Sequence, residues 1–148
     1  MILIKNRQRL FDIDEKWMHD LILKMLTVVK YQDFDIAFLL TSDATMRKYN
    51  HQFRQKDKAT DILSFPYHPD LKVGESIHVQ FEEDKNLGDI IISPRSVAKK
   101  AEEFDRSFQE HFVILLAHGI AHLLGHDHET DEDFKKMNSL EKRLLRVA

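Results

Sequence analysis

The stretch "FQEHFVILLAHGIAHLLGHDH", Phe108 to His128, joins a nearly continuous apolar run to four histidines within its last eleven residues. Ser107 stands directly before it and Glu110 follows three residues later, which is the capping box that opens a helix. Because the second half of this helix is apolar almost all round, it is predicted to be the buried central helix of the fold. Gly125 can adopt the left-handed conformation that ends a helix, so the chain is expected to reverse there.

The spacing of the histidines predicts a metal site. Residues four apart on a helix differ by only about 40° in direction, so His118 and His122 project from one face, one turn apart. After the reversal, His128 can return as a third ligand; His126 competes for this role but has less room to return, and we favour His128. Three neutral imidazoles leave one tetrahedral position for water, as in catalytic zinc sites. The alternative, separate core histidines, is costly because several imidazoles would be buried without a common partner.

Two further positions on this helix bear on the chemistry. His111 lies two turns before His118, about 10 Å along the axis, which is too far for the same ion, and a solvent-facing or substrate-facing role is expected for it. Gly119 follows the first ligand, where the metzincin proteases of the same histidine spacing carry a glutamate as general base. A zinc metalloprotease-like hydrolase therefore remains an alternative that lacks its base. Glycine in a helix costs about 1 kcal/mol relative to alanine, so we expect a site that needs room there.

Length and composition limit the number of domains and the types of metal ligand. The chain has 148 residues, the size of one domain, and we expect residues 1–148 to form a single one. It has no cysteine, so a metal must be held by nitrogen and oxygen ligands. Lys5 interrupts the first apolar run, no secretory signal or 18-residue apolar run is visible, and a cytoplasmic location is expected.

Hydrophobic periodicity and turn residues predict an α+β fold. The chain is expected to be a single domain with a small mixed β-sheet packed with helices, and a central buried helix that carries the metal-binding histidines. The first helix is expected to be capped by Asp12 together with Glu15. Strands are predicted at residues 1–5, 33–40, 61–66, 76–83 and 88–93, and helices at 14–30, from Ser42 to about Phe53, 93–104, 108–124 and after Thr130.

The net charge of −3 argues against a general polyanion binder, so a nucleic-acid partner needs a local basic patch. One such patch exists within twelve residues, opposed only by Asp57. A solvated charged face is the default interpretation of such a run, and an RNA-binding loop is the functional one. The patch consists of Arg47, Lys48, Arg54, Lys56 and Lys58.

Three separated motifs carry a family resemblance. "NHQFRQKDKATDILSFPY" (50–67), "GDIIIS" (88–93) and "HGIAHLLGHDH" (118–128) resemble, in the same order, the YbeY family of metal-dependent endoribonucleases, the rRNA maturation factors. The resemblance implies one Zn²⁺ per chain held by His118, His122 and His128. It implies Arg54 as the catalytic residue, because Arg54 matches the arginine of the family pattern N-x-x-[YF]-R.

The resemblance also implies a biological role. Members of this family act in the bacterial cytoplasm on single-stranded RNA, in rRNA maturation at the 3′ end of 16S rRNA and in ribosome quality control, which makes the small ribosomal subunit an expected partner. The chain departs from the family pattern at Ala121 and His126, and its segment 69–86 is longer than is typical. A further alternative is a non-catalytic ribosome-associated module, in which a structural metal holds the C-terminal helices and the basic loop binds RNA.

Overall fold

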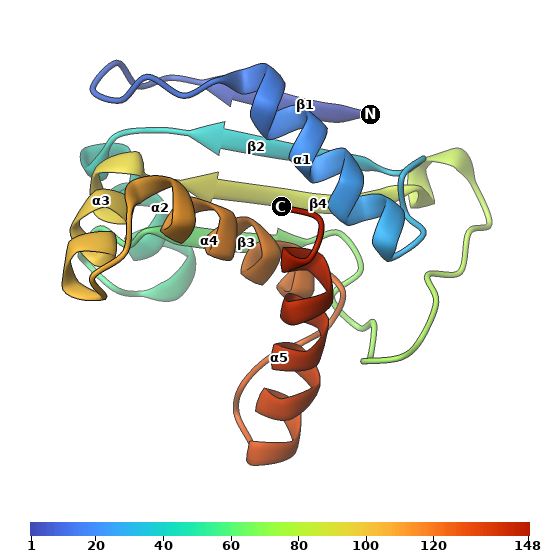
Figure 1. The fold of residues 1–148 in the computed structure, drawn as a ribbon. Coiled ribbons are helices and arrows are strands. Elements are labelled where there is room, and N and C mark those ends of the chain that lie inside the picture. Colours follow the sequence, from blue (N-terminus) through green and yellow to red (C-terminus); the bar gives the residue numbers. More distant parts are fainter.

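A computed structural model describes residues 1–148 and shows one four-stranded sheet with helices packed on it (Figure 1). The strand order is β1-β2-β4-β3, with β1, β2 and β4 parallel and β3 antiparallel at one edge. The predicted α+β class with a mixed sheet is thus confirmed. The elements are β1 (Ile2–Asn6), α1 (Glu15–Val28), β2 (Asp35–Leu40), α2 (Asp43–Arg54), β3 (Ile62–Pro66), the short 3-10 helix η1 (Glu82–Asp84), β4 (Asn86–Ile92), α3 (Pro94–Glu103), α4 (Phe108–Leu123) and α5 (Asp131–Leu145).

The main core lies between the sheet and the helices α1, α4 and α5 (Figure 1). Side chains alternate across a strand, so Ile36, Phe38 and Leu40 of β2 all enter this core. Helix α4 meets them with Phe112 and Leu116, which are fully buried. The predicted central helix is therefore confirmed, and its burial fixes the position of the histidines near its C-terminal end.

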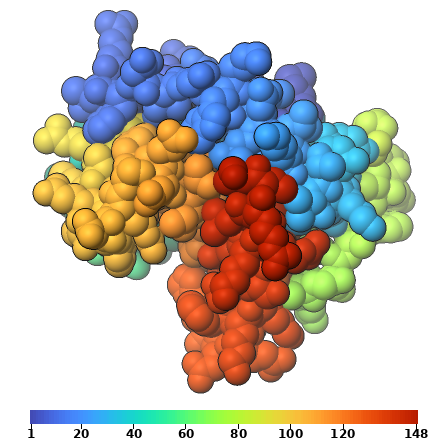
Figure 2. All heavy atoms as spheres, viewed as in Figure 1, coloured from blue at the N-terminus to red at the C-terminus, as the bar shows by residue number.

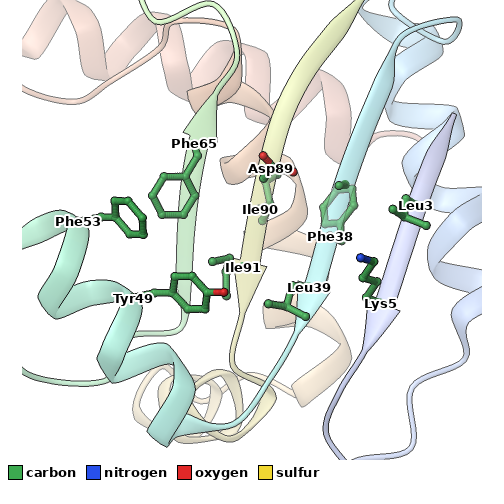
Figure 3. Close-up of a pocket in the computed structure, with 11 residues that line it drawn as sticks. Leu3, Lys5, Phe38, Leu39, Tyr49, Phe53, Phe65, Asp89, Ile90 and Ile91 are labelled. Carbon is green, nitrogen blue, oxygen red and sulfur yellow. The ribbon is translucent and has the colours of Figure 1, made fainter.

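The opposite face of the sheet is only partly covered. Helix α2 packs over β3 and β4 and leaves an apolar groove of about 420 Å³ that extends toward β1 (Figure 3). Tyr49 and Phe53 of α2 and Phe65 of β3 line one side of it, and Leu3 and Leu39 line its floor. Because these side chains point away from α4, the groove is separated from the histidine cluster by the sheet.

Helix starts agree with the sequence in most cases. Ser42, Ser107 and Thr130 each accept a hydrogen bond from a backbone amide three residues later, as N-caps do. The first helix differs, because Asp14 rather than Asp12 is its N-cap and accepts from the amide of Trp17.

The predicted strand at residues 76–83 is wrong. Of its three alternating apolar side chains only Ile77 is buried, while Val79 and Phe81 are exposed. The amide of Ile77 donates to the hydroxyl of Tyr31 at 3.0 Å instead of to a neighbouring strand. No strand of the sheet pairs with this segment, which runs as a loop and ends in η1.

The loop after α4 and the first turns of α5 form a lobe that projects from the body of the molecule, whereas the chain end lies against the body (Figure 2). The yellow-green segment that precedes β4 approaches the side of this lobe. None of the helices combines the length and the apolar character that a membrane crossing requires.

Candidate metal centre

The structure brings three of the histidines together. His118 and His122 lie on α4, His128 lies in the loop before α5, and each contributes one ring nitrogen to a group whose atoms all lie within 4.8 Å of one another. His118 and His122 are partly buried and His128 is exposed. One side of the cluster is therefore formed by the fold, and the other side is open to solvent.

Hydrogen bonds set the orientation of two of the rings. Nδ1 of His118 lies 2.9 Å from Oε1 of Glu141, and Nδ1 of His122 lies 2.9 Å from the carbonyl oxygen of His126. Both partners are acceptors, so both Nδ1 atoms carry the proton and donate it. The Nε2 atoms are then unprotonated in the neutral rings, and they face each other at 3.0 Å.

A proton between these two nitrogens is disfavoured. Burial, together with the neighbouring His118, lowers the pKa of His122 from its usual 6.5 to about 4, so the ring of His122 is neutral at pH 7. Two lone pairs at 3.0 Å repel each other unless a shared cation lies between the rings. A set of two or three neutral imidazole nitrogens is the ligand set of zinc and similar transition metals, and the residues present fit such an ion.

The turn after α4 decides between His126 and His128. Gly125 has φ +90°, and a Cβ atom there would collide with the carbonyl oxygen of Leu71. The amide of His126 then donates to the carbonyl oxygen of Ala121 at 3.1 Å, which closes the turn. In this turn His126 presents its carbonyl oxygen to His122, and the ring that joins the cluster belongs to His128.

Glu141 of α5 is a member of the site that sequence reasoning missed. It lies thirteen residues after His128 in an ordinary amphipathic helix, and no local pattern distinguishes it from other exposed glutamates. Only the packing of α5 against α4 brings its carboxylate, with a side chain 19% exposed, to His118. A carboxylate on the outer nitrogen of a ligating imidazole fixes the tautomer and raises the basicity of the ring.

We expect Glu141→Gln to weaken metal binding by about 10- to 100-fold while the fold persists. The amide keeps the shape of the side chain and can still accept a hydrogen bond, but it lacks the negative charge that strengthens the hydrogen bond from Nδ1 of His118. Zinc titration against a competing chelator measures the change. Glu132→Gln, which neutralises a glutamate in the first turn of the same helix, is the control; equal affinities in the two variants would remove Glu141 from the site.

Arg54 lies at the C-terminal end of α2 and reaches the edge strand β3. It donates to the carbonyl oxygen of Ser64 at 3.0 Å, and its guanidinium lies 5.4 Å from the centre of the Phe65 ring. No salt bridge engages its guanidinium, which is therefore free to bind an anion. No hydrogen bond joins Arg54 to the histidines. Arg54 and helix α4 nevertheless contact the same residue of β3. Arg54 binds the carbonyl oxygen of Ser64, and α4 packs beside the side chain of Ser64 at Gly119.

Gly119 allows helix α4 to pack closely on the sheet. A Cβ atom at this position would lie 2.9 Å from Cδ1 of Ile90 and 3.0 Å from Cδ1 of Ile62. The room expected beside His118 is therefore needed by the sheet and not by a substrate. It also places the position that carries the base in metzincins against the core.

The expectation of a solvent-facing or substrate-facing His111 is wrong. Its residue is 4% exposed, its Nδ1 lies 3.3 Å from Nη1 of Arg106, and its Nε2 has no hydrogen-bond partner, with the carboxylate of Asp61 3.6 Å away. Burial lowers the pKa of His111 despite this carboxylate. The His111 ring is covered because α3 and β3 both pack against α4, and the ring of Phe104 lies 6.0 Å from it.

Comparison with known proteins connects this geometry to a family. A family model described as Endoribonuclease YbeY matches residues 3–148. Endoribonuclease YbeY of Bartonella henselae is 39% identical over 138 residues, covering 89% of this chain and 83% of the relative. That of Clostridium perfringens is 33% identical, covering 98% and 95%.

A solved structure agrees with these matches. The solution structure of TM1509 from Thermotoga maritima matches this chain with a TM-score of 0.61 and 27% sequence identity. The match covers 99% of this chain and 90% of TM1509. The match extends through the elements that carry the histidine cluster and Arg54. The family model matches nearly the whole chain, and both relatives are more than 30% identical to it over most of their own length. The chain therefore belongs to the endoribonuclease YbeY family.

Proposed function

We propose that this chain is a zinc-dependent endoribonuclease that cleaves single-stranded RNA, with one Zn²⁺ held by His118, His122 and His128. We further propose that residues 1–148 act as a single catalytic domain, because one core of 26 residues joins the sheet to α1, α4 and α5. The observation that carries the proposal is the 3.0 Å approach of the Nε2 atoms of His118 and His122, beside a third imidazole that is exposed to solvent. RNA as substrate is supported by the endoribonuclease name of the relatives.

The residues of the chain have separable roles. A bound zinc ion would supply Lewis acidity and lower the pKa of a coordinated water molecule. Glu141 holds the ring of His118 in place through Nδ1, and the carbonyl oxygen of His126 does the same for His122. Arg54 is the catalytic residue, since its planar guanidinium matches phosphate oxygens and can complement the charge that develops on the phosphorus centre.

The basic loop after α2 would guide the RNA strand. Lys56 and Lys58 are exposed and have no ion-pair partner, whereas Arg47 is bound to Asp57 through two hydrogen bonds of 2.7 and 3.0 Å. Phosphate contacts release counterions, so RNA affinity should fall as salt is added. Within the basic patch predicted from the sequence, Lys56 and Lys58 therefore remain free to bind phosphates.

The cellular role follows from the family. We propose maturation of rRNA, at the 3′ end of 16S rRNA, and ribosome quality control as the processes, with the small ribosomal subunit as partner. A cytoplasmic location goes with this proposal, because rRNA and ribosomal subunits are there.

The experiment combines metal analysis with RNA cleavage. The purified protein is expected to carry about one zinc per chain and to cut a single-stranded RNA, and a chelator should stop cleavage until zinc is added back. Cyclic phosphate ends on the products would identify the neighbouring 2′-hydroxyl as the attacking group, and their absence would identify water. Zinc without any cleavage, together with a lower melting temperature after chelation, would support the structural-metal RNA-binding module instead.

A further inference from the structure

A cavity of about 440 Å³ lies beside the metal-binding turn, outside the site described above. Helix α5 forms one wall, and the long segment before β4 forms the other with Val73 and Gly74. A Cβ atom on Gly74 would have no heavy atom within 4 Å, so the cavity is open to solvent on this side. The two walls are held together where Gly125 packs on the backbone of Leu71.

The lining of this cavity is strongly basic. Lys135, Lys136 and Arg143 converge on it, and no aspartate or glutamate lines it. Lys136 pairs with Glu132 at 3.2 Å, whereas Lys135 and Arg143 are exposed and have no ion-pair partner. In a chain with a net charge of −3, such a group of cations without carboxylates beside them produces a local positive potential that attracts anions.

The cavity is adjacent to the metal centre. His126 lines it, and the same residue's carbonyl oxygen accepts the hydrogen bond from His122. His126 is two residues from His128, at most about 7 Å of extended chain. Its Nδ1 is buried without a hydrogen-bond partner. The positive charge of the cavity comes from its lysines and its arginine.

We propose that this cavity is a subsite that binds backbone phosphates of the RNA strand next to the bond that is cleaved, through Lys135, Lys136 and Arg143. The inference rests on the proposed endoribonuclease function and deepens it. Lys135 and Arg143 are eight residues apart on α5, about 12 Å along the axis, so the array suits successive phosphates of a strand better than one free phosphate ion. The long segment before β4 limits this subsite on its outer side and so shapes the path of the strand.

The test is Lys135→Ala/Arg143→Ala in the full-length zinc-loaded protein, with a single-stranded RNA of about ten nucleotides as substrate. We expect KM to rise about tenfold while kcat and zinc content stay within twofold. The slope of log KM against log salt concentration should fall by about 1.4, since each phosphate contact on a single strand contributes about 0.7. With a dinucleotide substrate, which has no flanking phosphate, the variant and the parent should have equal KM.

Lys5→Ala/Lys24→Ala is the matched control, because it removes the same charge from exposed lysines without ion-pair partners on β1 and α1. An equal rise of KM in the control would reduce the effect to net charge and overturn the subsite. An unchanged KM in the test variant, or a loss of zinc or kcat with KM unchanged, would overturn it as well. Failure of the proposed function is distinguishable, because the parent protein itself would then cut no RNA.

Discussion

Replacing His122 by alanine is expected to remove the bound metal and to lower RNA cleavage by at least about 1,000-fold, or about 4 kcal/mol. The imidazole of His122 is partly buried between His118, at 3.0 Å, and the turn that carries His126, at 2.9 Å, so its loss removes a ligand that the fold holds in place. The two histidines that remain lie on separate segments, α4 and the loop before α5. The core of α4 is untouched by the change, so the protein should still fold.

Elemental analysis, circular dichroism and RNA cleavage measure the outcome together. In the parent, added zinc should raise the melting temperature, because a ligand that binds only the folded state stabilises it. In His122→Ala this response should disappear. His19→Ala, at a half-exposed histidine of α1, is the control and should keep both metal and activity. One zinc per chain in His122→Ala would show that the metal lies elsewhere.

Replacing Arg54 by alanine is expected to reduce kcat by about 100- to 1,000-fold, the size of effect seen when one donor to a developing anion is removed. Zinc content should not change, since no hydrogen bond connects Arg54 to the histidines. Stability should fall by only about 1 kcal/mol, because the side chain loses one exposed hydrogen bond, to Ser64, and its contact with the Phe65 ring.

Two variants define the role of Arg54. Arg54→Lys keeps the charge but not the planar fork, so it should recover only part of kcat. Arg47→Ala, in the same basic stretch but engaged with Asp57, should change kcat by no more than about threefold. A loss of folded protein in Arg54→Ala, without a kinetic effect in the remaining folded fraction, would make Arg54 a structural residue.

Most helices and strands could be predicted from the sequence, because their signals are local. Ser42, Ser107 and Thr130 cap their helices through side chains that act within three residues. The apolar runs at β2 and β4 are typical of central strands, and each of the two has a strand on both sides. The strand predicted at residues 76–83 is wrong because the alternation of apolar and polar side chains is a weaker signal. It indicates a half-buried strand only where a neighbouring strand is free to pair.

The sequence by itself determined the helix that carries His118 and His122, their common face and the turn at Gly125, because helical periodicity and glycine backbone freedom are properties of a few neighbouring residues. Tertiary structure alone decided the rest of the site. Glu141 meets His118 across 23 residues of chain, and the basic cavity of α5 needs the segment before β4 as its second wall. His111, which was expected to face outward, became buried in the same way. Such contacts depend on how distant elements pack, and no spacing within one segment encodes them.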